Sequence, residues 1–313
     1  MMGKRSSAVH QTSQGQPYIL AKTGVAHTSF PYALPSERQV KKLAEKKRLT
    51  LEEKRELIRD LRPIDDIFFE VLADDIPTCQ EMLRVLLDDP KLIVKEVIVQ
   101  SSKRNLYGRS IRLDALCFLG DGTLCNIEVQ RGEEDHVKRT RYTAATLTVK
   151  HSEPGDKFRD LATVYIVYIS ENDIFGYGYP VYHMKHILEE TGTEVDDGCH
   201  ILFANTEYQD GSDKAELLSC FREKTVENPK FPVLSKRMKE LKESEGGLQA
   251  MSSVLQKYEE AARKEGFVKG RTEERLIAIR SMIKHGFPRE KIEQIYPKED
   301  IEKAIEQMKN EEQ

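Results

Sequence analysis

Apolar residues recur every three to four positions in two segments near the start of the chain, which predicts amphipathic helices. The first covers residues 64–73, and the second follows Pro77. Their apolar positions are Ile67, Phe68, Val71 and Leu72 in the first helix, and Met82, Leu83, Leu86 and Leu87 in the second. Ahead of both, Thr50 and Glu53 have the spacing of a capping box, which predicts that another helix begins there.

The pattern changes to strands after Pro90. Residues 92–100 form a short β-branched segment. The segments 110–119 and 123–130 then flank Gly120-Asp121-Gly122, a sequence typical of a hairpin turn. We therefore predict one strand followed by a β-hairpin.

Two further segments complete the predicted sheet and its cover. A helix is expected over residues 134–150, which contain neither Gly nor Pro. The continuous apolar run 161–169 predicts a strand that is buried on both faces. The order helix, strand, hairpin, helix and strand favours an α/β fold with a mixed central sheet.

Composition divides the chain into four segments. Residues 1–35 have little periodicity and predict a disordered tail. Residues 36–62 predict a basic helical arm, since ten Lys or Arg stand against five acids between Arg38 and Arg62. Residues 63–211 hold the predicted sheet, and residues 212–313 become helical.

The last segment is expected to contain short helices. They are predicted over 272–284, 288–295 and 298–308, with breaks at Gly286 and Pro297. A helix, a glycine and a second helix of this size are compatible with a DNA-binding helix-turn-helix or with a plain packing unit. Both interpretations stay open.

Charge and composition limit the classes of function that the protein can have. The chain has 49 basic and 53 acidic residues, a formal net charge of −4, which argues against a protein that coats nucleic acid indiscriminately but permits a local basic groove. Its longest apolar run, Val164–Ile169, is far shorter than the roughly 20 residues of a membrane span. With five scattered cysteines, no CxxC pair and no apolar leader after Met1, a cytoplasmic protein without a membrane partner is expected.

The hairpin carries the candidate chemistry. Period-two alternation places Arg112, Asp114 and Leu116 on one face of the first strand, and Glu128 and Gln130 on one face of the second. Asp114 and Glu128 can then converge at one end of the sheet, where two carboxylates repel unless a hard cation lies between them. Mg²⁺ at such a position can polarise a phosphodiester and lower the pKa of a bound water.

Acids in a hairpin are more often ordinary solvent-facing residues. Two features favour a functional site. Asp114 and Glu128 are embedded in apolar strand sequence, where an unpaired charge is costly. A basic segment over residues 138–142 follows directly and could place cations beside phosphates.

At these residues the chain resembles a known family. The segment GRSIRLDALCFLGDGTLCNIEVQ, followed by KRTRYTAATL, is similar to the PD-(D/E)XK nuclease family transposases, the Rpn-like recombination-promoting nucleases of bacteria. The likeness runs from about Ile64 through YIVYIS to PVYHM and resumes weakly around GFVKGR and IKHGFPREKIEQI. The shared motifs are Arg-Leu-Asp on one strand, Glu-x-Gln on the next, and Arg-x-Arg-Tyr on the helix.

The resemblance implies a restriction-endonuclease-like core and a metal-dependent DNA endonuclease that uses Mg²⁺, with Mn²⁺ as a substitute. By motif, Asp114 and Glu128 would be catalytic metal ligands, and the carbonyl of Val129 would be a further ligand. Gln130 occupies the position usually held by the catalytic Lys, where it can orient water but brings no positive charge. Glu70 would correspond to an acid that some members contribute from the helix before the sheet.

The basic helix would contact the DNA partner. Lys138, Arg139, Arg141 and Tyr142 are the expected DNA-binding residues, and one of the three cations could replace the charge that Gln130 lacks. Ordinary phosphate positioning or surface salt bridges explain Arg139 and Arg141 equally well. A homodimer is a further option.

Two other functions compete with a nuclease. A catalytically degenerate protein could keep the fold and act in nucleic-acid or protein binding, because Gln130 carries no charge. A helical adaptor could instead bind partners through the residues after 212.

Other motifs are weaker. His183 and His186 have the spacing of a metal pair on a helix but lack further ligands, so ordinary histidines are favoured. Gly120 and Gly122 are turn glycines, because no phosphate-loop motif surrounds them. A final group of aromatic residues could line a groove, although strand aromatics usually belong to the core: Tyr165, Tyr168, Tyr177 and Tyr179.

Overall fold

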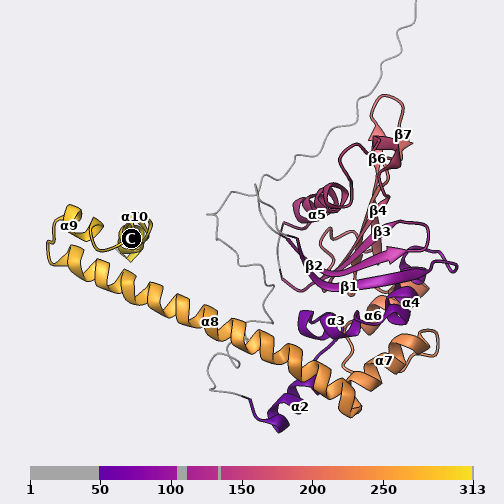
Figure 1. Ribbon diagram of the computed structural model, residues 1–313, viewed down its shortest axis with the longest axis horizontal. Helices are drawn as coiled ribbons and strands as arrows, with labels where there is room; N and C mark the ends of the chain where they lie inside the picture. Colours follow the sequence, from indigo (N-terminus) through magenta and orange to yellow (C-terminus); the bar gives the residue numbers. More distant parts are fainter. Residues whose placement is uncertain (1–48, 104–110, 133–134, 312–313) are drawn as a thin grey trace, which may run out of the picture. The chain divides into compact units, whose positions relative to one another are not determined.

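A six-stranded mixed sheet is the centre of the computed structural model, which describes residues 49–103, 111–132 and 135–311. The strand order is β1-β2-β3-β4-β8-β5 (Figure 1). The strands are β1 (Val94–Lys103), β2 (Ile111–Leu119), β3 (Leu124–Gln130), β4 (Val164–Ser170), β5 (Val181–Met184) and β8 (Cys199–Asn205). The first three are antiparallel neighbours, β3, β4 and β8 run parallel, and β5 returns antiparallel to β8. The predicted α/β fold with a mixed central sheet is confirmed.

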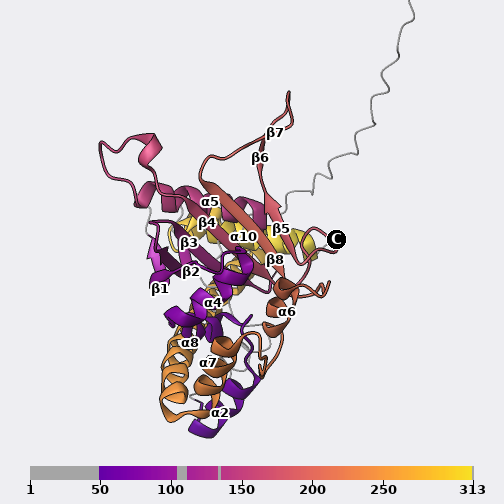
Figure 2. The same ribbon diagram turned by 90° about the vertical axis from the view of Figure 1, so that its right-hand side faces the viewer.

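Helices cover both faces of this sheet (Figures 1 and 2). The helices before and between the strands are α2 (Leu51–Asp60), α3 (Asp66–Leu72), α4 (Ile76–Leu86) and α5 (His136–Lys150), with a 3₁₀ turn η1 (Phe158–Asp160). The helices after the sheet are α6 (Asp213–Cys220), α7 (Pro232–Glu243), α8 (Glu245–Lys284), α9 (Arg289–Glu293) and α10 (Lys298–Glu311). A small hairpin, β6 (His186–Leu188) with β7 (Thr193–Val195), pairs apart from the main sheet.

Alternation along the strands divides the core into two layers. Ile127 and Val129 of β3 pack in the larger cluster, together with apolar residues of α3, α4, α6, α7 and the first half of α8. Leu124 of β3 and Ile166 of β4 point the other way, to a cluster that contains Ala144 and Leu147 of α5. Residues after 212 thus share a hydrophobic core with the sheet.

Local signals placed several boundaries well. The hairpin turn closes as Leu119 donates its N–H to the carbonyl of Thr123 at 2.9 Å. Gly122 has a φ of 92°, a left-handed conformation that favours glycine. At α2, Thr50 and Glu53 form the predicted capping box.

The C-terminal helices differ from the prediction in one respect. The helix expected to begin at Thr272 is only the last part of α8, a single helix of 40 residues. Gly266 and Gly270 lie inside α8 without interrupting it, since a helical glycine costs only about 1 kcal/mol relative to alanine. Gly286, with a φ of 76°, follows the end of α8 as predicted. The end of α8 then packs with α9 and α10 in a small cluster around Ile279 and Ile301.

Some predicted features lie outside the described residues, and others belong to a different kind of secondary structure than expected. The tail 1–35 and the first part of the basic arm, 36–48, are not described, and the rest of the arm contains α2 with Ile58 buried. His183 lies on β5 and His186 on β6, so the two do not share a helix, and the metal pair that was set aside finds no support. Among the described helices, none has the length and hydropathy needed to cross a membrane.

Candidate active site

Asp114 lies where the β2–β3 ladder ends. The regular pairing of these strands runs from Phe118 with Leu124 to Ala115 with Ile127. One step further, Asp114 accepts a hydrogen bond from the Val129 N–H through Oδ2, at 3.1 Å. The carboxyl is therefore held against β3, as the predicted convergence of the two strands requires. Burial raises its pKa to about 6, although Arg139 and the Val129 N–H act in the opposite direction.

The strict alternation predicted for β2 is wrong near this point. Leu113 and Leu116 both pack in the α5-side cluster, so the facing of the side chains shifts between them. Arg112 instead lies near residues of α3 and α8: its Nη2 is 3.6 Å from Oε2 of Glu70, and its Cζ is 5.9 Å from the ring centroid of Tyr258. The end of the ladder beside Asp114 accounts for this shift.

The Glu-x-Gln motif of β3 is fully buried. Glu128 is 1% exposed, and its Oε1 accepts a hydrogen bond from Nε of Arg139 and forms an ion pair with Nη2 of the same guanidinium. Gln130 is buried as well, and its Oε1 receives no hydrogen bond from any described residue. Val129 lies between them and contributes its N–H to Asp114, while its carbonyl remains a predicted ligand.

Asp66 is a candidate that sequence reasoning missed. It begins α3, and its pKa is well above the ordinary value because of burial and then the neighbouring charge of Asp114, with Arg139 opposing both. The signal that could have found it is an acid at a helix start beside a buried Phe-Phe pair, just before the sheet. Asp66 therefore joins Asp114 as a second carboxyl near the Arg139 guanidinium.

Glu70, one turn later in α3, is close to the same group. Its Oε1 is 3.7 Å from Nζ of Lys257, and its Oε2 is the atom near Arg112. Burial raises the pKa of Glu70, and its charge in turn raises the pKa of Asp114. The weaker sequence candidate thus lies at the edge of the acidic cluster.

Residues of α8 also reach this cluster. Tyr258 is buried, and its pKa is raised by burial and by the charge of Asp66. Lys257 precedes it and contacts Glu70. No local motif in the helical C-terminal half indicated this, because the contact joins residues nearly 190 positions apart, from Glu70 to Tyr258.

The four predicted DNA-binding residues on the basic helix α5 differ in their contacts and in their exposure to solvent. Arg139 faces Glu128 and forms an ion pair with it. Lys138 and Arg141 are exposed, and Lys138 forms an ion pair with Asp135 at 2.8 Å. Tyr142 is half-buried. Of the three cations proposed to replace the missing lysine charge, the structure brings Arg139 to the acids.

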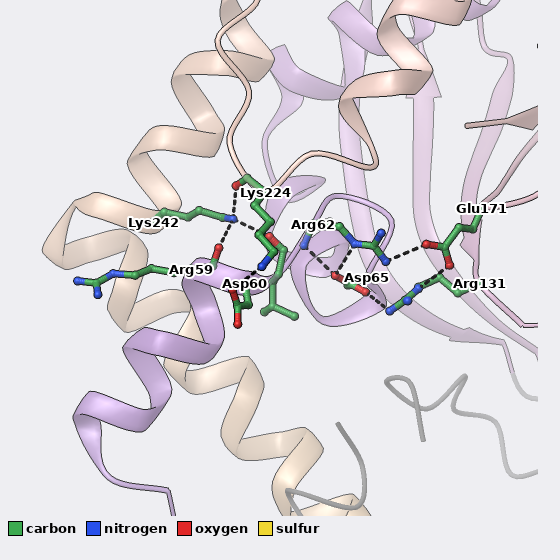
Figure 3. Close-up of polar contacts among 9 residues, drawn as sticks. Arg59, Asp60, Arg62, Asp65, Arg131, Glu171, Lys224 and Lys242 are labelled. Carbon is green, nitrogen blue, oxygen red and sulfur yellow. Dashed lines mark hydrogen bonds and ion pairs between the residues drawn. The ribbon is translucent and has the colours of Figure 1, made fainter. Parts of the chain in front are cut away.

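A four-residue ion-pair network fixes the elements behind the site (Figure 3). Arg131 Nη1 lies 2.5 Å from Asp65 Oδ1, and Arg131 Nε lies 2.9 Å from Glu171 Oε2. Arg62 Nη2 contacts the other oxygen of Glu171 at 2.9 Å, and Arg62 Nε lies 3.7 Å from Oδ2 of Asp65. Since Asp65 precedes Asp66 and Arg131 follows Gln130, the network ties the start of α3 to the ends of β3 and β4.

Lys242 of α7 supports the same region from outside (Figure 3). Its ammonium donates hydrogen bonds to the carbonyls of Arg59, at 3.0 Å, Leu61, at 2.5 Å, and Lys224. Burial lowers its pKa to about 8. These bonds fix the chain between α2 and α3, upstream of Asp66.

The cluster has the donor chemistry of a hard-cation site, although its contacts include a guanidinium. Asp66, Asp114 and Glu128 offer carboxylate oxygens, which Mg²⁺ prefers. The raised pKa values of Asp66 and Asp114 indicate charged forms that burial disfavours and that a cation would stabilise. Among the residues that the structure describes, no group of three or more His, Cys, Asp or Glu is placed to hold a metal ion. The three carboxylates therefore suit Mg²⁺ only if Glu128 gives up its ion pair with Arg139 and contacts the metal ion instead.

Comparisons with known proteins found no relative of this chain. No family model, curated protein or solved structure matches the chain. The chemistry of the site is therefore argued from its own residues.

Proposed function

We propose that the protein is a bacterial cytoplasmic DNA endonuclease of the PD-(D/E)XK type, which hydrolyses phosphodiester bonds with Mg²⁺ in the manner of the transposase-like recombination-promoting nucleases. The observation that carries the proposal is that Asp66 of α3 and Asp114 of β2 lie close enough for the charge of Asp114 to raise the pKa of Asp66, while Arg139, whose charge acts on both, pairs with Glu128 of β3. Placing carboxyls where burial disfavours their charged forms is costly, and groups with pKa values shifted in this way are candidates for a functional site.

In this proposal, each group of residues has a distinct role in binding the ion, the water or the phosphate. Asp66, Asp114 and Glu128 would hold the ion, which supplies a polarised phosphodiester and a more acidic bound water. The buried amide of Gln130 has an oxygen with no donor among the described residues and so can orient water. Arg141, exposed on α5, would contact phosphate.

The decisive experiment is plasmid nicking with Mg²⁺. We expect the wild type to nick supercoiled DNA, and Asp114→Ala and Glu128→Ala to lose roughly 100-fold or more of this activity, since a metal ligand matters at least as much as its supporting groups. Asp121→Ala, which alters an exposed acid in the turn of the same hairpin, is the matched control and should nick like the wild type. A wild type as inactive as Asp114→Ala would overturn the proposal.

A second function is favoured by the ion pair of Arg139. Its guanidinium supplies positive charge to Glu128, as a bound metal would, which is what a degenerate site acting only in nucleic-acid or protein binding would show. Titration calorimetry with Mg²⁺ separates the two functions. A nuclease should give binding heat that Asp114→Ala abolishes, whereas a degenerate site should give none in either protein.

A further inference from the structure

Three tyrosine side chains are exposed together beyond the ends of β4 and β8. Tyr177 is 76% exposed, Tyr179 is 60% exposed and Tyr208 is 41% exposed. We call these three residues the tyrosine patch. A tyrosine ring carries a large apolar surface, so rings left open to water together indicate a binding surface more than a packing role.

The backbone below the patch is tightly held. Asp173 accepts hydrogen bonds from three backbone N–H groups, those of Phe175, Gly176 and Gly178, at 2.8–3.1 Å. The hydroxyl of Tyr182 donates to the same carboxylate. That hydroxyl also accepts the N–H groups of Tyr177 and Tyr179, each at 3.2 Å. The rings are therefore exposed on a loop whose backbone is already ordered.

The third ring is fixed against the same loop. Gly178 has a φ of 74°, and a Cβ at this position would lie 3.2 Å from the Tyr208 ring, so the ring rests on the glycine backbone. Asn205 connects the two parts: its Nδ2 donates to the carbonyl of Tyr179 at 2.5 Å, and its Oδ1 accepts the N–H of Tyr208 at 3.0 Å. Such prior ordering lowers the entropic cost of binding a ligand.

The patch lies at the same edge of the sheet as the candidate active site. The parallel strands β3, β4 and β8 end in register at Gln130, Ser170 and Asn205. Adjacent strands are about 4.8 Å apart, so Asn205 is about 10 Å from Gln130. By alternation, Asn205 and Gln130 belong to the α5 side of the sheet, which also carries the exposed Arg141.

The acids near the patch are already engaged. Glu171 is paired with Arg62 and Arg131, and Glu207 accepts the Asp173 N–H at 3.0 Å. The loop 174–180 contains no Lys or Arg. Any ligand would thus meet aromatic faces here, without a phosphate-binding cation.

We infer that the tyrosine patch stacks unpaired nucleobases of a single strand whose neighbouring nucleotides lie in the candidate active site. The inference deepens the proposed function and rests on it. Bases suit the surface because every base has an aromatic face, so stacking tolerates any sequence. The strand's phosphates are then left to the cations of α5, on the same side of the sheet.

The experiment compares binding of fluorescein-labelled oligothymidylate with that of a duplex of equal length, in buffer with EDTA to prevent cleavage. We expect the wild type to prefer the single strand and the double variant Tyr177→Ala/Tyr179→Ala to weaken this binding at least about tenfold, because each stacked base contributes about 1–3 kcal/mol. The double variant Tyr177→Phe/Tyr179→Phe keeps both rings and should restore the affinity.

Phe158→Ala provides the matched control, since this ring is 93% exposed on η1 and outside the patch. Its affinity for oligothymidylate should equal that of the wild type. A second readout comes from intrinsic emission: the chain has no Trp, so stacking should quench tyrosine fluorescence in the wild type and less in the alanine variant. Equal single-strand affinity in wild type and alanine variant, or equal weakening by the phenylalanine variant, overturns the inference.

The outcome is separable from that of the proposed function. Intact nicking with no effect of the tyrosines on binding rejects the stacking site alone. Tyrosine-dependent binding without metal-dependent nicking rejects the endonuclease and leaves a single-strand binding protein.

Discussion

Asp114 is a partly buried residue whose charged carboxylate form the folded chain disfavours. Its pKa rises from 3.8 to about 6, mainly through burial. Because the folded-state pKa exceeds the unfolded one, the protonated form is favoured on folding, so the contribution of Asp114 to stability is most favourable below the unfolded pKa and falls as the pH rises from there through about 6. A carboxyl kept at this cost, beside Asp66, is expected of a site that binds a cation.

The first stability prediction concerns Asp114→Asn without metal. Asparagine keeps an oxygen for the Val129 N–H and removes the charge, so the variant should be more stable than wild type at pH 8 by on the order of 3 kcal/mol. The advantage should nearly vanish at pH 3, where Asp114 is mostly protonated in the folded and the unfolded state alike. Urea denaturation in EDTA at the two pH values measures it.

Asp121→Asn is the matched control for this prediction. A hydrogen bond from the Thr123 N–H lowers the pKa of Asp121, so its charged form is favoured in the folded state and its contribution is lost as the pH falls through the folded pKa. The exchange should destabilise the protein slightly at pH 8. A similar gain in both variants would show that lost charge in general, and not the buried site, causes the effect.

At the scale of residues, the sequence predicted those acids whose spacing within one hairpin brings them together. Asp114 and Glu128 are 14 positions apart on two strands that share one turn, so the hairpin signal places both at the same end of these strands, although the strict alternation predicted for β2 fails there. Asp66 and Tyr258 reach the cluster from elements far away in sequence. Their positions depend on how α3 and α8 pack, which no local pattern encodes.

At the scale of elements, the corner between α7 and α8 depends on one glycine. A Cβ on Gly247 would lie 2.2 Å from the carbonyl oxygen of Glu240 and 2.6 Å from Cα of Leu241. A Cβ on Gly246 would meet nothing within 4 Å. The first half of α8, which carries Tyr258 to the site, therefore starts from a close backbone contact that only Gly247 permits.

These neighbouring glycines provide a matched pair of variants. Gly247→Ala must move α8 away from α7 and should lower the free energy of unfolding by about 1–3 kcal/mol, as other overpacked sites do. Gly246→Ala should be neutral or stabilising by up to about 1 kcal/mol, since alanine is the better helix former. Urea denaturation of both variants checks this, and equal effects would contradict the close contact.

Sequence patterns located most elements but not their joins. Strands β2, β3 and β4 were expected within a few residues because hairpin and buried-strand signals are local. The continuity of α8 was not predicted, since the helix expected from Thr272 is only its last part; Gly266 and Gly270 do not interrupt it, because the cost of a glycine is too small to break a long helix. The short strands β5, β6 and β7 had no strong period of their own, and β8, although seven residues long, was not predicted either.

At the scale of the whole molecule, the net charge of −4 hides local differences. On the α5 side of the sheet, Lys138 and Arg141 are exposed, while Arg139 is taken up by Glu128. On this side, a nucleic acid would therefore meet a few cations and aromatic rings among the residues that the structure describes. Affinity should depend on these contacts more than on bulk charge.

Salt dependence tests this view of the charge distribution. If Lys138 and Arg141 make the phosphate contacts, the logarithm of the affinity for duplex DNA should fall with the logarithm of salt concentration with a slope of about −2, and Arg141→Ala should reduce its size by about 0.9. Arg159→Ala, an exposed arginine on η1, is the control and should leave the slope unchanged. Fluorescence anisotropy in EDTA at several salt concentrations gives the slope. A steep slope that both variants reduce equally would instead indicate binding by bulk positive charge.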